Sequence, residues 1–128
     1  MKVDTHKNVE KVIRYYLKYL PPKGVKSILD VGGGTKPPYK GILKNRCEKY
    51  SCLDIREGEG VDYRIDLTEG TVFEDNEWEW IWCAETLEHI PEELENKFIT
   101  ELLRISENVV ITFPTPIHPS FAEDPGHH

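Results

Sequence analysis

The sequence predicts an α/β domain in which a mostly parallel sheet carries helices on both faces. Short apolar runs, typical of strands that are covered on both sides, alternate with segments whose apolar residues recur every three or four positions. Three of these runs end in, or are followed by, an acid: Asp54, Asp66 and Glu85. Because the carboxyl ends of parallel strands meet at one edge of the sheet, we expect these acids to gather there.

The chain of 128 residues is expected to form a single domain, with an amino-terminal helix in 1–24, a core in 25–113 and a proline-rich tail in 114–128. Apolar residues between His6 and Leu20 are spaced three and four apart, which makes one stripe of an amphipathic helix. The prolines and the glycine within 21–24 end this helix.

Five segments have the composition of strands: 26–31, 50–55, 61–65, 78–84 and 108–113. In the fourth of them, Trp78, Trp80 and Trp82 alternate with other residues, which predicts that the three indoles share one face. Between the strands, the sequence predicts a short helix at 39–43. A longer helix is expected to begin at Pro91, a residue type favoured in the first turn.

Composition and charge exclude several classes of protein. Hydrophobic residues make up 38% of the chain and charged residues 30%, so neither a disordered chain nor a membrane protein is expected. The first residues lack the apolar core of a signal peptide, and the three cysteines form no C-x-x-C pair, so we expect reduced thiols in the cytoplasm. The net charge of −7 does not indicate nucleic-acid binding. Basic residues at 36–49 could still form a local lip for an anionic substrate.

The glycines at 32–34 follow a buried strand, where open α/β sheets bind nucleotide-like ligands. A dinucleotide fingerprint needs G-x-G-x-x-G leading into a helix. Gly32 and Gly34 supply the first two positions, but Pro37 stands at the third and Pro38 follows it. Proline has no N–H to offer a diphosphate. A dinucleotide-dependent oxidoreductase is therefore disfavoured.

A ligand without phosphates fits the acids better. Asp54, at the end of the second strand, is suited to accept hydrogen bonds from both hydroxyls of a ribose. Asp66 would accept from the exocyclic amine of an adenine, with the backbone of Leu67 completing that edge. Asp30 would lie beside an ammonium or sulfonium group. Several carboxylates around one ligand are favourable if the ligand carries positive charge.

These segments resemble the successive motifs of the class I S-adenosylmethionine-dependent methyltransferases. The resemblance rests on Asp30-Val31-Gly32-Gly33-Gly34, Asp54, Asp66-Leu67, VFEDNEW at 72–78 and AETLEHIP at 84–91, and it covers roughly residues 27–114. It implies a Rossmann-like fold and S-adenosylmethionine as cofactor. It also implies cofactor contacts from Asp30, Gly32, Gly33, Gly34, Asp54, Ile55, Asp66, Leu67 and Glu85.

The implied reaction is attack by a nucleophile on a sulfonium methyl group, in which catalysis is largely positioning and desolvation. A base is needed only for a hydroxyl or ammonium acceptor. His89 is the candidate base, and its alternative role is to brace the loop by a hydrogen bond. No metal site is predicted. The one alternative is the E-x-x-E-H pattern of Glu85, Glu88 and His89, which in principle suits Mg²⁺ or Mn²⁺.

The chain departs from the family pattern after the fifth strand, where the usual final helix and antiparallel pair of strands are lacking. It is therefore expected to be a short or carboxyl-terminally truncated member. The fifth strand would be left as a sheet edge, which we expect the tail, a second copy of the chain or a partner to cover. A non-catalytic cofactor-binding or interaction module remains the alternative function, and the methyl acceptor stays open.

Overall fold

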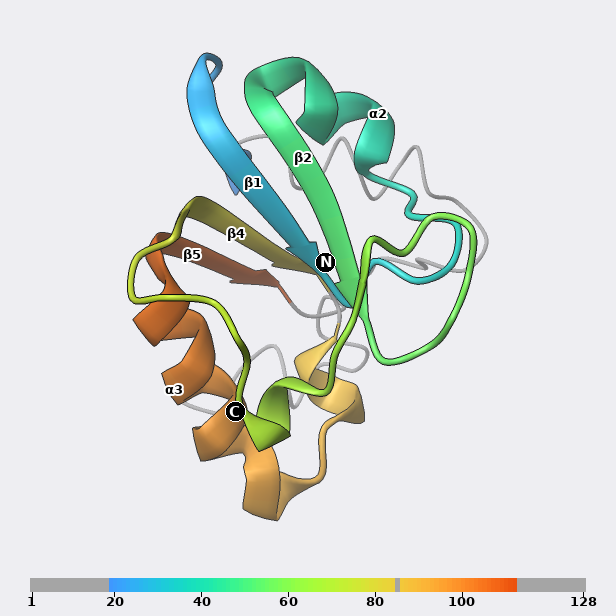
Figure 1. Ribbon diagram of the computed structural model, residues 1–128, viewed down its shortest axis with the longest axis vertical. Helices are drawn as coiled ribbons and strands as arrows, with labels where there is room; N and C mark the ends of the chain where they lie inside the picture. Colours follow the sequence, from blue (N-terminus) through green and yellow to red (C-terminus); the bar gives the residue numbers. More distant parts are fainter. Residues whose placement is uncertain (1–18, 85, 113–128) are drawn as a thin grey trace, which may run out of the picture.

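The computed structural model describes residues 19–84 and 86–112. Their centre is a five-stranded sheet in the order β3-β2-β1-β4-β5, and every neighbouring pair is parallel (Figure 1). The strands are β1 (Val25–Val31), β2 (Cys47–Asp54), β3 (Tyr63–Arg64), β4 (Trp78–Ala84) and β5 (Ser106–Thr112). The order reverses between β1 and β4, and the crevice outside such a reversal is where open α/β sheets bind ligands. The parallel α/β fold is confirmed.

The helices between the strands are short, apart from one. They are α2 (Lys40–Leu43), α3 (Glu95–Ile105) and the 3-10 turns η2 (Lys44–Arg46), η3 (Leu67–Glu69), η4 (Leu87–His89) and η5 (Glu92–Leu94). The prediction that the long helix begins at Pro91 was wrong. Pro91 is extended, with ψ 140°, and a single 3-10 turn separates it from α3.

The two faces of the sheet are covered by different helices. On one face, the buried side of α3, with Phe98, Leu102 and Ile105, packs against residues of all three central strands, including Leu29 and Ile81. On the other face, Tyr39 and Leu43 at α2 pack against neighbours that alternate with the first set: Val25, Ile28 and Trp82. Helices on both faces were predicted, and α2 and α3 confirm this.

The three tryptophans of β4 do not share one face, so that prediction was wrong. Trp80 and Trp82 pack on the α2 side, where the rings of Trp82 and Tyr39 meet edge to face at 5.4 Å. Trp78 belongs to the α3 side, where its ring lies 5.6 Å from that of Phe73. Trp78 is the first residue of the strand, and there the aromatic neighbours at the sheet end decide its direction rather than the alternation of the strand.

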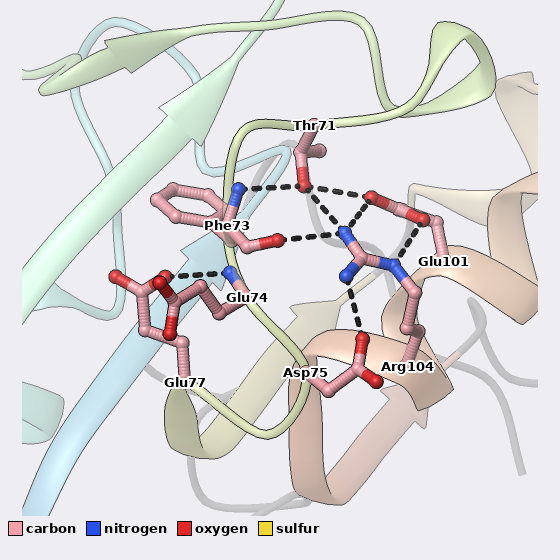
Figure 2. A network of polar contacts seen from close by, with 7 residues as sticks. All are labelled: Thr71, Phe73, Glu74, Asp75, Glu77, Glu101 and Arg104. Carbon is pink, nitrogen blue, oxygen red and sulfur yellow. Dashed lines mark hydrogen bonds and ion pairs between the residues drawn. The ribbon is translucent and has the colours of Figure 1, made fainter.

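The segment before β4 is tied to α3 by a polar network centred on Arg104 (Figure 2). Its guanidinium donates to both carboxylate oxygens of Glu101 at 2.7 and 2.9 Å, to Asp75 Oδ1 at 2.8 Å and to the backbone oxygen of Phe73 at 2.8 Å. The hydrogen bonds from Arg104 lower the pKa of Glu101 to about 2. Thr71 Oγ1 also donates to Glu101, at 2.7 Å. This network holds the segment that precedes β4 against α3, the helix that follows β4 in the chain.

Some predictions fall outside the described residues. The helix predicted between residues 6 and 20 and the tail at 114–128 belong to them, and both stay predictions. Within the described residues, β5 pairs only with β4, so its other edge is the end of the sheet. None of the helices in the described ranges combines the length and the apolar character that crossing a bilayer requires.

Candidate functional site

A pocket of about 630 Å³ lies at the carboxyl ends of β1 and β2, where Val31 and Asp54 line it. Six of the predicted site residues line it: Gly32, Asp54, Ile55, Asp66, Leu67 and His89. Its other walls are Arg56, Thr86 and a largely apolar set that includes Ile65, Ile90, Leu94 and Phe98. The acids that follow β2 and β3 therefore meet at one pocket, as their positions in the sequence predict.

The glycine loop turns sharply at the end of β1. Gly32 has φ +73°, and its N–H donates to the backbone oxygen of Leu53 at 2.7 Å. A Cβ at Gly32 would lie 2.2 Å from Thr86 Oγ1, so this position needs glycine for its conformation and for its space. Thr86 Oγ1 in turn donates to the backbone oxygens of Val31 and Ala84, each at 3.2 Å. The loop thus packs directly against the segment after β4.

Asp54 is the most constrained acid of the pocket. Its residue is 4% exposed, and its carboxylate accepts from Gly34 N at 2.8 Å and from Arg56 N at 2.9 Å. The Arg56 side chain adds two hydrogen bonds, from Nε at 3.0 Å and from Nη2 at 3.2 Å. Burial by itself would raise the pKa of Asp54, but the hydrogen bonds and the charge of Arg56 together hold it below its usual range. Asp54 is therefore an ionised carboxylate that joins the glycine loop to β2.

Asp66 caps the 3-10 turn that begins at Leu67. Its Oδ1 accepts from Thr68 N at 2.9 Å and from Thr68 Oγ1 at 2.6 Å. Asp66 Oδ2 accepts no hydrogen bond from the described residues and is available to a ligand donor. Leu67 is buried, whereas Ile55 is 62% exposed beside the same pocket. An exposed isoleucine and a buried leucine at one opening offer apolar contact to a flat ring.

Asp30 does not line this pocket. It is buried below the glycine loop, where Tyr50 Oη donates to its Oδ2 at 2.6 Å. Burial raises the pKa of Asp30 to about 7, the hydrogen bond from Tyr50 opposes that rise, and the charge of Asp54 adds to it. A Cβ on Gly33 would lie 2.9 Å from Cys52 Sγ and 3.1 Å from the Asp30 carboxyl group. Asp30 therefore supports the loop from beneath.

Asp30 makes the stability of the fold depend on pH. Its pKa is raised on folding, from 3.8 to about 7, so the folded state favours the neutral form. We expect the free energy of unfolding to decrease as the pH rises from about 4 to about 7 and to level off at higher pH. The part of this decrease that falls between pH 6 and pH 8 should be roughly 1 kcal/mol. Asp30→Asn should remove this decrease. Urea unfolding of both proteins at several pH values measures it, and two parallel pH profiles would contradict it.

His89 and Glu88 lie after β4, in the turn η4, whereas Glu85 is outside the described residues. His89 lines the pocket with its side chain 75% exposed, and its Nε2 is 3.6 Å from Glu88 Oε2. Among residues 19–84 and 86–112, no three His, Cys, Asp or Glu side chains are grouped to hold a metal ion. The alternative metal set includes Glu85, so it stays untested.

Arg56 and Thr86 also line the pocket, although neither was predicted as a site residue from the sequence. Arg56 stands two residues beyond Asp54, which is the spacing at which a side chain can fold back on a strand-end carboxylate. No pattern in the sequence predicts the role of Thr86, because Thr86 packs into the space beside Gly32 where a side chain would otherwise lie. The apolar residues Leu94 and Phe98, which follow Pro91 in the region predicted to be a helix, also line the pocket.

Comparison with solved structures identifies the fold. A methyltransferase from Archaeoglobus fulgidus, described as S-adenosylmethionine-dependent, matches with a TM-score of 0.69 and 22% identity over 93% of this chain and 59% of its own. The N-methyltransferase NodS from Bradyrhizobium japonicum, in complex with S-adenosylhomocysteine, matches with a TM-score of 0.58 and 13% identity over 79% and 56%. The [4+2]-cyclase SpnF matches with a TM-score of 0.60 and 17% identity over 75% and 40%.

No protein-family model and no curated protein matches the sequence. The chain spans about half the length of the solved structures it resembles, between 40% and 59% for these three. At these identities the likeness shows the fold, and the sheet order and the pocket at its reversal agree with it. The chain therefore has the Rossmann-like fold of the class I S-adenosylmethionine-dependent methyltransferases.

Proposed function

We propose that this protein binds S-adenosylmethionine in the pocket beside β1 and β2 and transfers its methyl group to an acceptor. The observation that carries the proposal is the pairing of two acids, Asp54 and Asp66, at the ends of adjacent strands around one pocket with apolar walls. A nucleoside has the same division: a ribose with two hydroxyl donors and a flat base with one amine. The acids and the apolar side chains are matched to those two parts.

Each residue has a distinct task in this proposal. Asp54 accepts hydrogen bonds from the ribose hydroxyls, and the available oxygen of Asp66 accepts from the adenine amine. Ile55 and Leu67 contact the ring. The loop at 32–34 lies along the methionine part, where its small residues allow close approach to the backbone. Glu85 would supply negative charge toward the cationic end of the cofactor, and Asp30 would support the loop from beneath, through its hydrogen bond with Tyr50.

The bound cofactor would supply a methyl group on a sulfonium centre, whose departure needs no acid. What this chain would add is position and exclusion of water, because a half-buried glycine loop and apolar walls hold the ligand in one orientation. His89, exposed at the pocket, is placed to take a proton from an acceptor hydroxyl or ammonium group. With an acceptor that carries no such proton, His89 has no catalytic task.

The second candidate function is binding without methyl transfer. A protein described as a [4+2]-cyclase has the same fold, so the fold does not fix the reaction. In that case Asp54 and Asp66 would still bind the nucleoside, and the protein would serve as a cofactor-dependent or interaction module. The β5 edge suits such a role, because a second copy of the chain or a partner strand could pair with it.

Calorimetric titration tests the proposed function directly. We expect S-adenosylmethionine and S-adenosylhomocysteine to bind with one site per chain, and NAD not to bind, because Pro37 and Pro38 remove two backbone donors. Preferred binding of NAD, or binding of none of the three, would refute the proposal. If the first two bind, a screen of acceptors with labelled methyl groups decides between transfer and binding alone.

A further inference from the structure

The carboxylate proposed to bind ribose is already occupied within the protein. Asp54 Oδ1 accepts from the backbone N and the side-chain Nε of Arg56, and Asp54 Oδ2 accepts from Gly34 N and from Arg56 Nη2. The two backbone donors belong to the fold. The two side-chain donors come from a residue that lines the same pocket.

The guanidinium group presents its donors as a vicinal diol would. Two N–H groups approach the two oxygens of one carboxylate in parallel, and the 2′ and 3′ hydroxyls of a ribose would approach the same two oxygens side by side. Each carboxylate oxygen already holds one backbone donor, which leaves room for one further donor each. The guanidinium and a ribose therefore cannot both occupy Asp54.

The Arg56 side chain can move away from Asp54 at a small cost in free energy. Its side chain is 65% exposed, while that of Asp54 is 5% exposed, so the arginine can turn into solvent and the acid cannot. Its Nη2 lies 3.3 Å from the place that a Cβ of Gly34 would take, which puts the guanidinium over the glycine loop. When it leaves, the guanidinium regains its hydration, and the ligand hydroxyls take over its two hydrogen bonds to Asp54, so that one set of hydrogen bonds replaces another.

We propose that Arg56 is a displaceable occupant of the ribose subsite, which keeps the Asp54 carboxylate hydrogen-bonded until a ligand with a vicinal diol replaces it. The inference rests on the proposed function, because it takes Asp54 as the ribose acceptor. Its consequence is a competition: the apparent affinity for a nucleoside is reduced by the fraction of molecules in which Arg56 covers Asp54. Removing the side chain should therefore tighten binding.

Arg56→Ala tests the competition, with S-adenosylhomocysteine as the ligand because it carries no net charge. We expect Arg56→Ala to bind it about 3- to 10-fold more tightly than the unmodified protein. The 2′,3′-dideoxy counterpart of the ligand should gain nothing, because it does not compete for Asp54. Arg56→Lys, which has no fork of donors, should lie between the two proteins, and it replaces Arg56→Ala if that variant does not fold.

Arg64→Ala is the matched control. Arg64 is also 65% exposed; it pairs with Glu57 at 3.6 Å and donates from Nε to the backbone oxygen of Ile55 at 3.1 Å. Arg64→Ala therefore removes the same charge from the neighbouring strand and leaves the four hydrogen bonds to the Asp54 carboxylate in place. Its affinity should stay within about twofold of the unmodified protein. Equal or weaker binding by Arg56→Ala, with the unmodified protein binding normally, would overturn the role of Arg56 alone. If no variant binds the ligand, the proposed function and this inference fall together.

Discussion

Replacing Asp54 by alanine is expected to weaken binding of S-adenosylhomocysteine by about 100-fold. A carboxylate that accepts from two ribose hydroxyls makes two charge-assisted hydrogen bonds, each worth about 1.5 kcal/mol or more. Their sum of about 3 kcal/mol corresponds to two orders of magnitude in the dissociation constant. Isothermal titration calorimetry of the variant and the unmodified protein measures the difference.

Two further variants separate binding from stability. Asp54→Asn keeps the size of the side chain and can still accept from Gly34 N, but it lacks the charge, so its affinity should fall by a smaller factor. Asp75→Ala removes an equally negative side chain that is 77% exposed at the Arg104 network, and its affinity should not change. A folded Asp54→Ala protein that binds as well as the unmodified one would show that Asp54 is not the ribose acceptor.

The fold could be predicted because its strands are apolar runs with clear ends. Strand β4 was predicted with the bounds that the structure has, Trp78–Ala84. The other four were placed within about three residues, although β3 is only Tyr63–Arg64. The direction of Trp78 could not be predicted from alternation. It depends on Phe73, which lies in an irregular segment that Arg104 holds in place from a distant helix.

The site was predictable where a residue's task follows from its place at a strand end. Asp54 and Asp66 follow β2 and β3, and both line the pocket. Asp30 was also expected at the ligand; it is buried, accepts from Tyr50 and is absent from the pocket lining, and its contact with a ligand stays a prediction. Arg56 and Thr86 were not predicted because their roles depend on contacts in the folded structure. Arg56 contacts the carboxylate of Asp54, and Thr86 fills the space where a side chain at Gly32 would lie.

Gly32→Ala is expected to destabilise the fold by roughly 2 to 5 kcal/mol. At φ +73° an alanine costs about 1–2 kcal/mol for its left-handed conformation. Its Cβ would also lie 2.2 Å from Thr86 Oγ1 and 2.6 Å from Thr86 Cγ2, and such overpacking adds about 1–3 kcal/mol. A protein of ordinary stability would lose a large part of its free energy of unfolding. Urea unfolding measures the change.

Gly24→Ala separates the two contributions. Gly24 has a similar φ of +87°, but nothing lies within 4 Å of the place its Cβ would take, so only the conformational cost of about 1–2 kcal/mol is expected. Adding Thr86→Ala to Gly32→Ala removes the two nearest atoms and should recover part of the overpacking term, which a double-mutant cycle isolates. Equal losses in Gly24→Ala and Gly32→Ala would mean that the loop relaxes away from Thr86. In that case the contact between the glycine loop and the segment after β4 would not be what shapes the pocket at Gly32 and Thr86.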